Sequence, residues 1–470
     1  MKLESLSLAM IAAVLATSCA NEELVDVNPD VQGNALHFSP MVGHSRAIET
    51  TVNNLGDFAV VAKGIHPHGG VYTSYLIGGA KAGEKATKEG TSTWTLENSV
   101  YWPSSMENVV FWAYTTSRVV GPATTPILPN GVEFGFNESG TTPSISNFTP
   151  LKADLSGADD AGQWNDGADQ TDLLVSFVQQ SRTTSASYVN LNFDHALSQI
   201  TIKAQSKGKL ASDHRIVRIK GAWVVNTNNK AVLSAGFEWD GDAKKATSNN
   251  KWTGSIDGFS AYGSFFKEPI LLDNATQNVT LLGPESSLML VPQKLEKWNK
   301  ESKPTGAYIL LLCRVELRHS GTDHSGSANL DDIEIYEGNH YHQQFPVNAN
   351  QLYDASEYGF VCVPIESNWE MGKRYEYTLD ICGAATGAGI YPPDFSSEET
   401  NKLIPSDKEF SNPLGGDSKS LVLGKRPVAP EGSKKEVGDP VLDEPIQFTV
   451  AVKEWIDAEG EEWKPGVELR

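Results

Sequence analysis

Apolar and polar residues alternate along most of the chain with a period of two, which is the pattern of strands that bury one face. In the stretch "YVNLNFDHALSQITIKA", the apolar Val189, Leu191 and Phe193 share one face. The stretches "FAVVAKG", "RYEYTLDICG" and "PIQFTVAVKEW" alternate in the same way. Helical periodicity does not persist beyond about two turns, so crossover helices are not expected. The pattern predicts an all-β fold of antiparallel sandwiches and argues against a parallel α/β sheet.

One expected strand departs from this alternation. The stretch "NVVFWAYTT" is apolar on both faces. It predicts a central strand that is covered on both sides or, alternatively, a strand that presents Trp112 at a domain interface.

The length of 470 residues exceeds what one ordinary core accommodates, so two domains are expected. The stretch "SFVQQSRTTSAS" is polar and lacks apolar periodicity, which places the boundary near residue 186. The first sandwich then spans residues 47–186 and the second spans 187–470. Residues of about 384–440 are rich in Pro, Gly and Ser and predict a mobile insertion at one end of the second sandwich.

The charge is acidic, with 38 Lys and Arg against 59 Asp and Glu and a formal net charge of -21. Such a surface repels a phosphate backbone, so nucleic acid is not an expected partner. The acidic residues are spread through the chain, as in a solvated surface.

The N-terminal stretch "MKLESLSLAMIAAVLATSC" has the layout of a secretory signal, with Lys2 before an apolar run and small residues at its end. Its apolar part, Leu6 to Ala16, is shorter than the roughly 20 residues that a membrane-spanning helix needs. We therefore expect the chain to be exported.

Three cysteines follow Cys19. Cys313 lies within "YILLLCRVEL" and is interpreted as a buried, inert residue. Cys362 and Cys382 lie on neighbouring strand-like runs, and sequence leaves open whether they form a disulfide. None of the three lies in a recognisable protease signature.

Other candidate chemistry is weak. The acidic run "DLSGADDAGQWNDGADQTD" lacks the ligand spacing of a calcium loop and is interpreted as solvated. His340 and His342 share a face and would need a third ligand to hold a metal, whereas His195 at a strand break predicts a structural hydrogen bond. Phosphate loops, nucleophile elbows and zinc patterns are missing from the sequence, so we expect neither a cofactor nor an enzyme.

The end of the signal resembles that of bacterial lipoproteins. Ala16, Thr17 and Ser18 directly precede Cys19, which in such proteins becomes the new N-terminus and is acylated, for example with palmitate. The residues "ANEE" that follow resemble the tag that sends some lipoproteins to the outer face of the outer membrane. The resemblance implies a signal peptide over residues 1–18 and lipidation at Cys19.

Taken in order, "SVYWPSSMENVVFWAYTT", "DQTDLLVSF", "VNLNFDHALSQITIKA", "LMLVPQ" and "IQFTVAVKEW" resemble the fimbrillin family of pilus lipoproteins from Leu36 to Trp455. The resemblance implies two consecutive antiparallel Greek-key β-sandwiches of the transthyretin-like type. It also implies a precursor that is carried to the cell surface and joins other pilus subunits by donor-strand exchange. A host or bacterial surface receptor would be a further partner.

The resemblance further implies cleavage by an Arg-specific protease. The expected first strand is "NALHFSPMVG", with Leu36 and Phe38 on one face, and the polar stretch after it contains Arg46. We expect the cut between Arg46 and Ala47, so that residues 19–46 form a propeptide with the lipid anchor and the first strand. Removal of that strand would leave a groove for a strand of another subunit.

Three roles remain open at this point. The tail after Trp455 contains Pro465 and Gly466 and would make a poor donor, so the donor is either "IQFTVAVKEW" or absent. A chain without a donor would be a tip or accessory adhesin. A third alternative is a non-polymerising lipoprotein that binds glycans through exposed aromatic residues: Trp252, Trp298 and Trp369.

Overall fold

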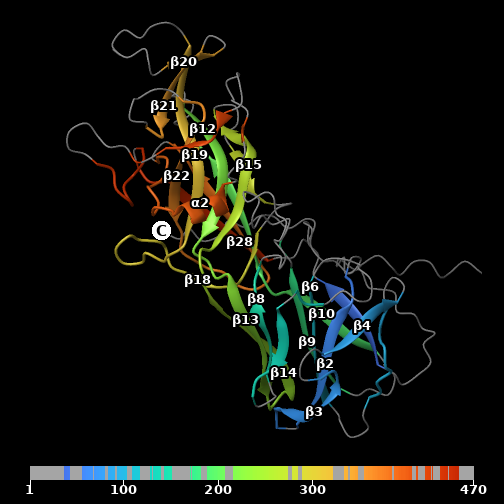
Figure 1. The fold of residues 1–470 in the computed structure, drawn as a ribbon. Coiled ribbons are helices and arrows are strands. Elements are labelled where there is room, and N and C mark those ends of the chain that lie inside the picture. The colour runs from blue at the N-terminus through green and yellow to red at the C-terminus, as the bar shows by residue number, and fades with distance from the viewer. Residues whose placement is uncertain are drawn as a thin grey trace, which may run out of the picture.

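The structure is a computed structural model (Figure 1). It describes residues 36–42, 55–66, 68–79, 83–89, 93–102, 108–116, 127–129, 131–138, 142–150, 170, 172–181, 188–206, 215–273, 278–283, 288–320, 333–336, 339–347, 354–383, 386–404, 409–410, 419–424, 426, 434–442 and 444–454. Within these residues it is almost entirely β, as the alternation predicts.

The first sheet closes on itself. Its order is β3 (Val71–Ile77), β2 (Phe58–Ile65), β4 (Glu84–Glu89), β5 (Thr93–Leu96), β1 (His37–Val42), β10 (Tyr188–His195), β9 (Leu173–Ser181) and β6 (Asn108–Thr116). Because β2 also pairs with β6, the strands from β2 through β1 to β6 form a ring. Alternate side chains of each strand point inward, and those of β10 are the predicted Val189, Leu191 and Phe193.

A second sheet lies against the outside of this ring. It contains β14 (Lys245–Ser255), β13 (Lys230–Asp240), β8 (Pro143–Phe148) and β7 (Glu133–Phe136). In Figure 1 the long hairpin β13–β14 reaches from the upper part of the molecule down along β9. The indole of Trp112 in β6 donates to the carbonyl of Ala235 in β13 at 3.1 Å. The strand "NVVFWAYTT" is therefore covered on both sides and also carries Trp112 at a contact between sheets.

Two further sheets form a sandwich in the C-terminal part. One contains β16 (Asn278–Leu282), β11 (Ser198–Gln205), β24 (Lys373–Asp380), β28 (Gln447–Glu454) and β17 (Leu288–Leu290). The other contains β15 (Ala261–Leu272), β12 (Arg215–Val225), β19 (Tyr308–Ser320), β21 (Asn339–Phe345), β20 (Ile333–Tyr336), β22 (Glu357–Pro364) and β27 (Val422–Leu423). Their facing side chains form one core, in which Ile200 and Tyr377 meet Ile219 and Leu311. Two small ladders complete the strands: β18 (Lys294–Leu295) with β23 (Ser367–Asn368), and β25 (Glu409–Phe410) with β26 (Lys419–Ser420).

Most strand pairs are antiparallel, as predicted, but three pairs are parallel. β1 pairs in parallel with β10, β11 with β24, and β22 with β27. The members of each pair are far apart in the chain, so no tight hairpin imposes the antiparallel direction. The predicted boundary near residue 186 precedes β10, which pairs with β9 and β1, so the chain leaves the first sheet only after His195.

The Pro, Gly and Ser-rich stretch after residue 384 contains described segments that cover the outer face of the sheet of β12 and β19. The helix α2 (Ser397–Leu403) begins with a capping box at Ser396 and buries Leu403. Phe395 packs edge-to-face on Phe259 of the segment before β15 and on Phe360 of β22. These residues lie over a sheet face, not at one end of the sandwich as predicted. No helix among the described residues has the length and apolar character needed to cross a membrane.

Candidate functional site

The first strand of the described chain, β1, fills a position inside the ring between β5 and β10. Here we call that position the strand slot. Along its whole length β1 pairs with β10, from His37 opposite Tyr188 to Val42 opposite Phe193. The expected first strand is therefore present, with the buried Leu36 just before it and Phe38 on the inner face.

Aromatic side chains surround Phe38 in the strand slot. Its ring centroid lies 5.9 Å from that of Phe58 and 6.4 Å from that of Phe111, both in edge-to-face geometry. Phe58 extends the cluster to Trp94 at 6.2 Å and Phe193 at 5.3 Å. Phe38 is 0% exposed, so removal of β1 would open an aromatic cavity in the core of the ring.

Trp94, which pairs with Phe38 across the ladder between β5 and β1, is also held by contacts that do not involve β1. The indole of Trp94 donates to the carbonyl of Gly56 at 2.8 Å, and the ammonium of Lys88 lies 4.8 Å from the Trp94 ring centroid. Lys88 also donates to the carbonyl of Leu55 at 3.2 Å, and burial lowers its pKa. Asp57 anchors the same segment through an ion pair of 2.7 Å with Lys85. The wall can therefore keep its shape when the slot changes occupant.

The last described strand, β28, lies at the edge of its sheet. It pairs with β24 from Gln447 opposite Asp380 to Glu454 opposite Lys373. Phe448 packs on Tyr377 with ring centroids 6.1 Å apart, whereas Val452 is 45% exposed. Within the described residues no strand pairs with its outer edge, so its release breaks one ladder.

The residues predicted for lipidation and cleavage, Cys19, Arg46 and Ala47, lie outside the described residues. The same holds for most of the acidic run between β8 and β9. Asp172 at its end is described, and it is fully buried.

The structure brings His195 and Asp172 together although they are distant in the sequence. His195 Nδ1 lies 2.8 Å from Asp172 Oδ2, and both side chains are buried. The pair joins the end of β10 to the residue before β9. The predicted structural hydrogen bond of His195 is confirmed, but alternation gave no signal for its partner.

The histidines of β21 meet a third histidine from β19. His319 lies opposite His340 across the ladder, and His319 Nε2 lies 3.1 Å from His342 Nε2. The His319 and His342 rings are nearly parallel with centroids 5.2 Å apart, and a hydrogen bond between the two Nε2 atoms requires one ring as donor and the other as acceptor. No group of three or more His, Cys, Asp or Glu side chains in the described part of the chain is placed to hold a metal ion.

The three described cysteines are free and buried, so Cys362 and Cys382 do not form a disulfide. Cys382 and Cys313 lie in the core between the two sheets of the sandwich. Cys362 lies on the outer face of the sheet of β12 and β19, beneath the segments that cover that face. Burial raises the pKa of the Cys313 and Cys362 thiols.

Two of the three tryptophans named for a glycan-binding surface are buried, and Trp252 is half-buried. Trp298 is 4% exposed and Trp369 is 2% exposed, and Trp369 donates to the Tyr377 hydroxyl at 3.0 Å. Trp252 packs on Phe148 and donates to a backbone carbonyl. Trp298 and Trp369 are therefore core residues and are not available to a glycan.

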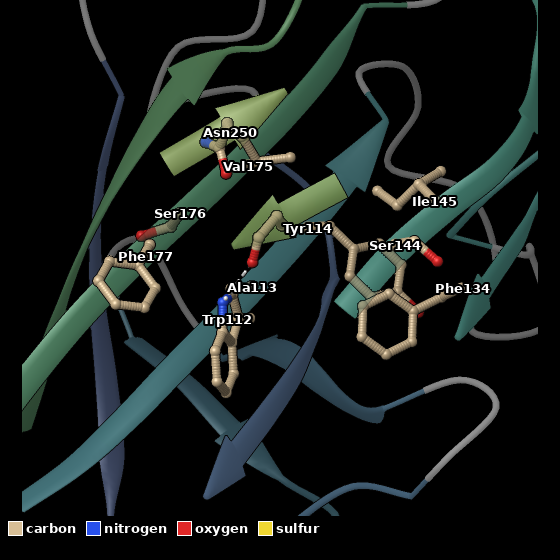
Figure 2. Close-up of a pocket in the computed structure, with 11 residues that line it drawn as sticks. Trp112, Ala113, Tyr114, Phe134, Ser144, Ile145, Val175, Ser176, Phe177 and Asn250 are labelled. Carbon is tan, nitrogen blue, oxygen red and sulfur yellow. Dashed lines mark hydrogen bonds between the residues drawn. The ribbon is translucent and has the colours of Figure 1, made fainter. Parts of the chain in front are cut away.

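A small cavity lies between the ring and the sheet of β13 (Figure 2). Trp112, Tyr114, Phe134 and the buried Ser176 contribute to its lining. Its volume is about 20 Å³, which leaves room for a water molecule but not for a sugar ring.

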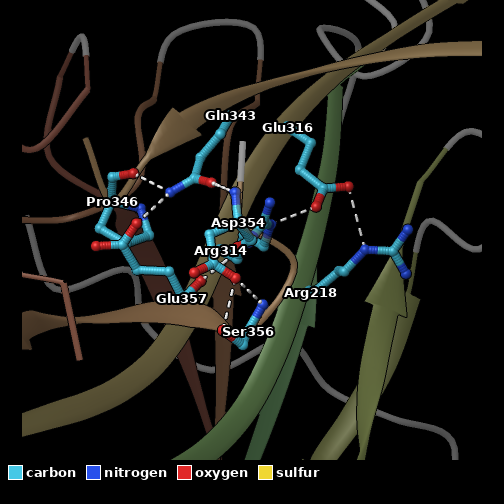
Figure 3. Close-up of polar contacts among 8 residues, drawn as sticks. All are labelled: Arg218, Arg314, Glu316, Gln343, Pro346, Asp354, Ser356 and Glu357. Atoms are coloured by element: carbon cyan, nitrogen blue, oxygen red, sulfur yellow. Dashed lines mark hydrogen bonds and ion pairs between the residues drawn. The ribbon is translucent and has the colours of Figure 1, made fainter. Parts of the chain in front are cut away.

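A buried charge network lies on the outer face of β12 and β19 (Figure 3). Arg314 donates to Glu316 Oε1, and Arg218 Nε donates to Glu316 Oε2 at 3.1 Å. Arg314 also donates to the carbonyls of Asp354 and Glu357. Although burial opposes ionisation, the two guanidinium groups hold the pKa of Glu316 below its usual value. Sequence reasoning missed this network, whose signal is a charged residue at every second position of "CRVEL".

The chain matches the fimbrillin-like family over residues 46–389. Among solved structures it is similar to a fimbrial protein from Bacteroides vulgatus, with 14% identity, a TM-score of 0.42, and coverage of 74% of this chain and 95% of that one. It is also similar to the tip fimbrial protein Mfa3 from Porphyromonas gingivalis, with 13% identity, a TM-score of 0.28, and coverage of 74% and 95%. No curated protein matches.

Proposed function

The chain belongs to the fimbrillin-like family, and from this membership we propose that it is a structural subunit of a surface pilus that contributes to cell adhesion. It is made as a lipoprotein precursor that carries acyl chains on Cys19 and reaches the outer membrane. An Arg-specific protease then cuts between Arg46 and Ala47. The cut chain joins other pilus subunits by donor-strand exchange and becomes part of the fimbria.

One observation carries this proposal. β1 is a complete inner strand of the ring, and it lies directly before the segment that contains Arg46. A cut in that segment turns β1 into a separate piece held only by non-covalent contacts. Loss of this piece exposes ladder groups of β10 and an aromatic cavity, and an incoming strand satisfies both.

The finer fold and the domain limits belong to the same proposal. We assign two consecutive Greek-key sandwiches of the transthyretin-like type to residues 47–186 and 187–470. In this division β10, at the start of the second span, supplies the wall of the strand slot that pairs with β1.

The position of β28 supports a shaft subunit over a tip or accessory subunit. A tip accepts a strand but need not give one, whereas a shaft subunit must do both. β28 has an apolar inner face, and among the described strands it pairs only with β24. Its release therefore breaks a single ladder, which fits the role of donor.

The proposal is tested by blocking the cut in cells. We expect surface extracts of the wild type, heated mildly in detergent, to give a ladder of oligomers on a gel. The variants Arg46→Ala and Arg46→Lys should give a single band that keeps its lipid, because the protease requires Arg. Arg182→Ala removes another Arg from a polar stretch and should leave the ladder unchanged. A full ladder from Arg46→Ala would contradict the proposal.

A further inference from the structure

The sheet of β14, β13, β8 and β7, here called the outer sheet, packs against one side of the ring. We propose that the outer sheet is a brace that holds β2, β6 and β9 in place, so that the strand slot keeps its shape while β1 is absent. Gln179 and Phe237 are then positioning residues of the slot, although neither belongs to the strands that pair with β1. The inference rests on the proposed function, because only a subunit that loses β1 has to keep an empty slot open.

Phe58 and Phe111 line the strand slot and project from strands that the outer sheet contacts on their other face. Phe58 lies on β2 and Phe111 on β6, and Phe193 lies on β10, which β9 joins to β6. Neighbouring side chains of a strand point to opposite faces, so the residues next to Phe58 and Phe111 point toward the outer sheet. A contact on the outside of the ring therefore fixes the backbone from which a side chain reaches into the slot.

Two of these ring strands have a directional contact with the outer sheet. On β6, the indole N–H of Trp112 donates to the carbonyl of Ala235 in β13 at 3.1 Å. On β2, the ammonium of the buried Lys63 lies 4.6 Å from the ring centroid of Phe136 in β7. Because these contacts join β2 and β6 to two strands of one outer sheet, they oppose separation of β2 from β6.

The third ring strand, β9, is held to the start of β14 by one side-chain amide. Gln179 Oε1 accepts the N–H of Ala246 at 2.6 Å, and Gln179 Nε2 donates to the carbonyl of Lys244 at 3.1 Å. The amide therefore bonds β14 as a peptide group of a neighbouring strand would. Phe237 of β13 stacks on Phe177 of β9 with ring centroids 5.8 Å apart, so β9 has both a polar and an aromatic contact with the hairpin.

β4 and β5 are the ring strands that the brace does not hold. Among the described residues, the cores between the ring and the outer sheet contain side chains of β2, β6 and β9 but none of β4 or β5. In the ring order β1 separates β5 from β10, so loss of β1 leaves β5 paired only with β4. The brace therefore divides the ring into strands that it holds and strands that it does not, and this difference can be measured.

Hydrogen exchange of the uncut chain from residue 20 tests the contacts of the brace independently of assembly. Phe237→Ala should speed exchange of the β6 and β9 amides at least about tenfold, and Gln179→Ala several-fold, because each removes a contact between the two layers. The β4 and β5 amides should change less than about threefold. Asn249→Ala is the matched control: the Asn249 amide donates at 2.8 Å to Glu238 on the exposed side of the same hairpin, and its loss should change neither set. Equal acceleration of both sets by Phe237→Ala would overturn the brace.

Rebinding of β1 tests the effect of the brace on the slot. A sequence-specific protease site is inserted after Arg46, the chain is cut, the β1 fragment is removed, and a dye-labelled peptide of residues 34–44 is added at increasing concentration. The wild type should bind this peptide, and Phe237→Ala should bind it at least about tenfold more weakly, because a slot that is not held in its bound shape must be ordered on binding. Gln179→Ala should weaken binding several-fold and Asn249→Ala less than about twofold.

The outcomes separate the two claims. If the β1 fragment stays bound after the cut, or if the empty slot of the wild type binds no peptide, the proposed function fails. Exchange in the uncut chain then still decides whether the outer sheet holds β6 and β9. If Phe237→Ala and Gln179→Ala bind the peptide as tightly as the wild type, the slot keeps its shape without the outer sheet and the inference fails alone.

Discussion

The aromatic anchor of β1 allows a direct test of how the ring is held together. Phe38 is 0% exposed and contacts Phe58 and Phe111 inside the ring. Truncation of such a side chain costs about 3–5 kcal/mol, because transfer energy is lost and a cavity remains. We therefore expect Phe38→Ala to lower the free energy of opening of the ring by this amount in the uncut precursor.

Hydrogen exchange followed by mass spectrometry measures the free energy of opening of the ring separately from that of the sandwich. A local measurement is needed because a chain with several cores need not unfold in one step. Because each 1.4 kcal/mol changes the opening equilibrium tenfold, the amides of β10 should exchange about 100-fold faster or more in the variant. Amides of β12 in the sandwich should change little. Ser39→Ala is the matched control, since Ser39 lies on β1 but outside the inner face. Less than about threefold acceleration in β10 would refute the claim that Phe38 anchors the strand.

Three further predictions concern the sandwich. Glu316→Gln should lower the free energy of urea unfolding by about 3–5 kcal/mol at pH 7, because Arg314 and Arg218 stay buried without their carboxylate; the exposed control Glu366→Gln should have little effect. Since the pKa of Glu316 is lowered in the folded state, this loss should fade as the pH falls below the unfolded value near 4.5. Burial lowers the pKa of Lys220 from 10.5 to about 8, opposed by Glu268. Between these pH values the folded state binds fewer protons than the unfolded state, so the free energy of unfolding of the wild type rises with pH. Lys220→Met should raise the free energy of unfolding by up to about 3 kcal/mol at pH 7. The difference between variant and wild type should shrink as the pH approaches 10.5. Cys313, Cys362 and Cys382 should resist a thiol reagent until urea unfolds the chain, and rapid labelling of the native protein would show that a thiol is accessible.

Alternation identified most strands because it depends on which face of a strand meets a core. It predicted the inner faces of β10, β24 and β28 and the first strand β1. The coverage of β6 on both sides was predicted from the opposite signal, apolar residues on both faces. It did not predict strand neighbours, because a parallel partner such as β24 for β11 is chosen by packing across a long stretch of chain. The pairing of β13 with β8, which lies far earlier in the chain, was missed because sequence distance again hides the partner.

Polar partners were harder to predict than strands. His195 was correctly assigned a structural hydrogen bond, but Asp172 reaches it through the fold and not through sequence spacing. Cys362 and Cys382 were expected to be neighbours because the strands near them follow each other in the chain. They lie on opposite sides of the sheet that contains β12 and β19. The alternative of a glycan-binding surface required exposed tryptophans, and burial rules this out at Trp298 and Trp369.

The central claim is that β1 leaves the strand slot when the subunit assembles. N-terminal sequencing of the chain recovered from assembled fibres tests it most directly. The account predicts an N-terminus at Ala47, with residues 19–46 absent from the fibre. An acylated Cys19 still joined to β1 in the assembled chain would contradict it.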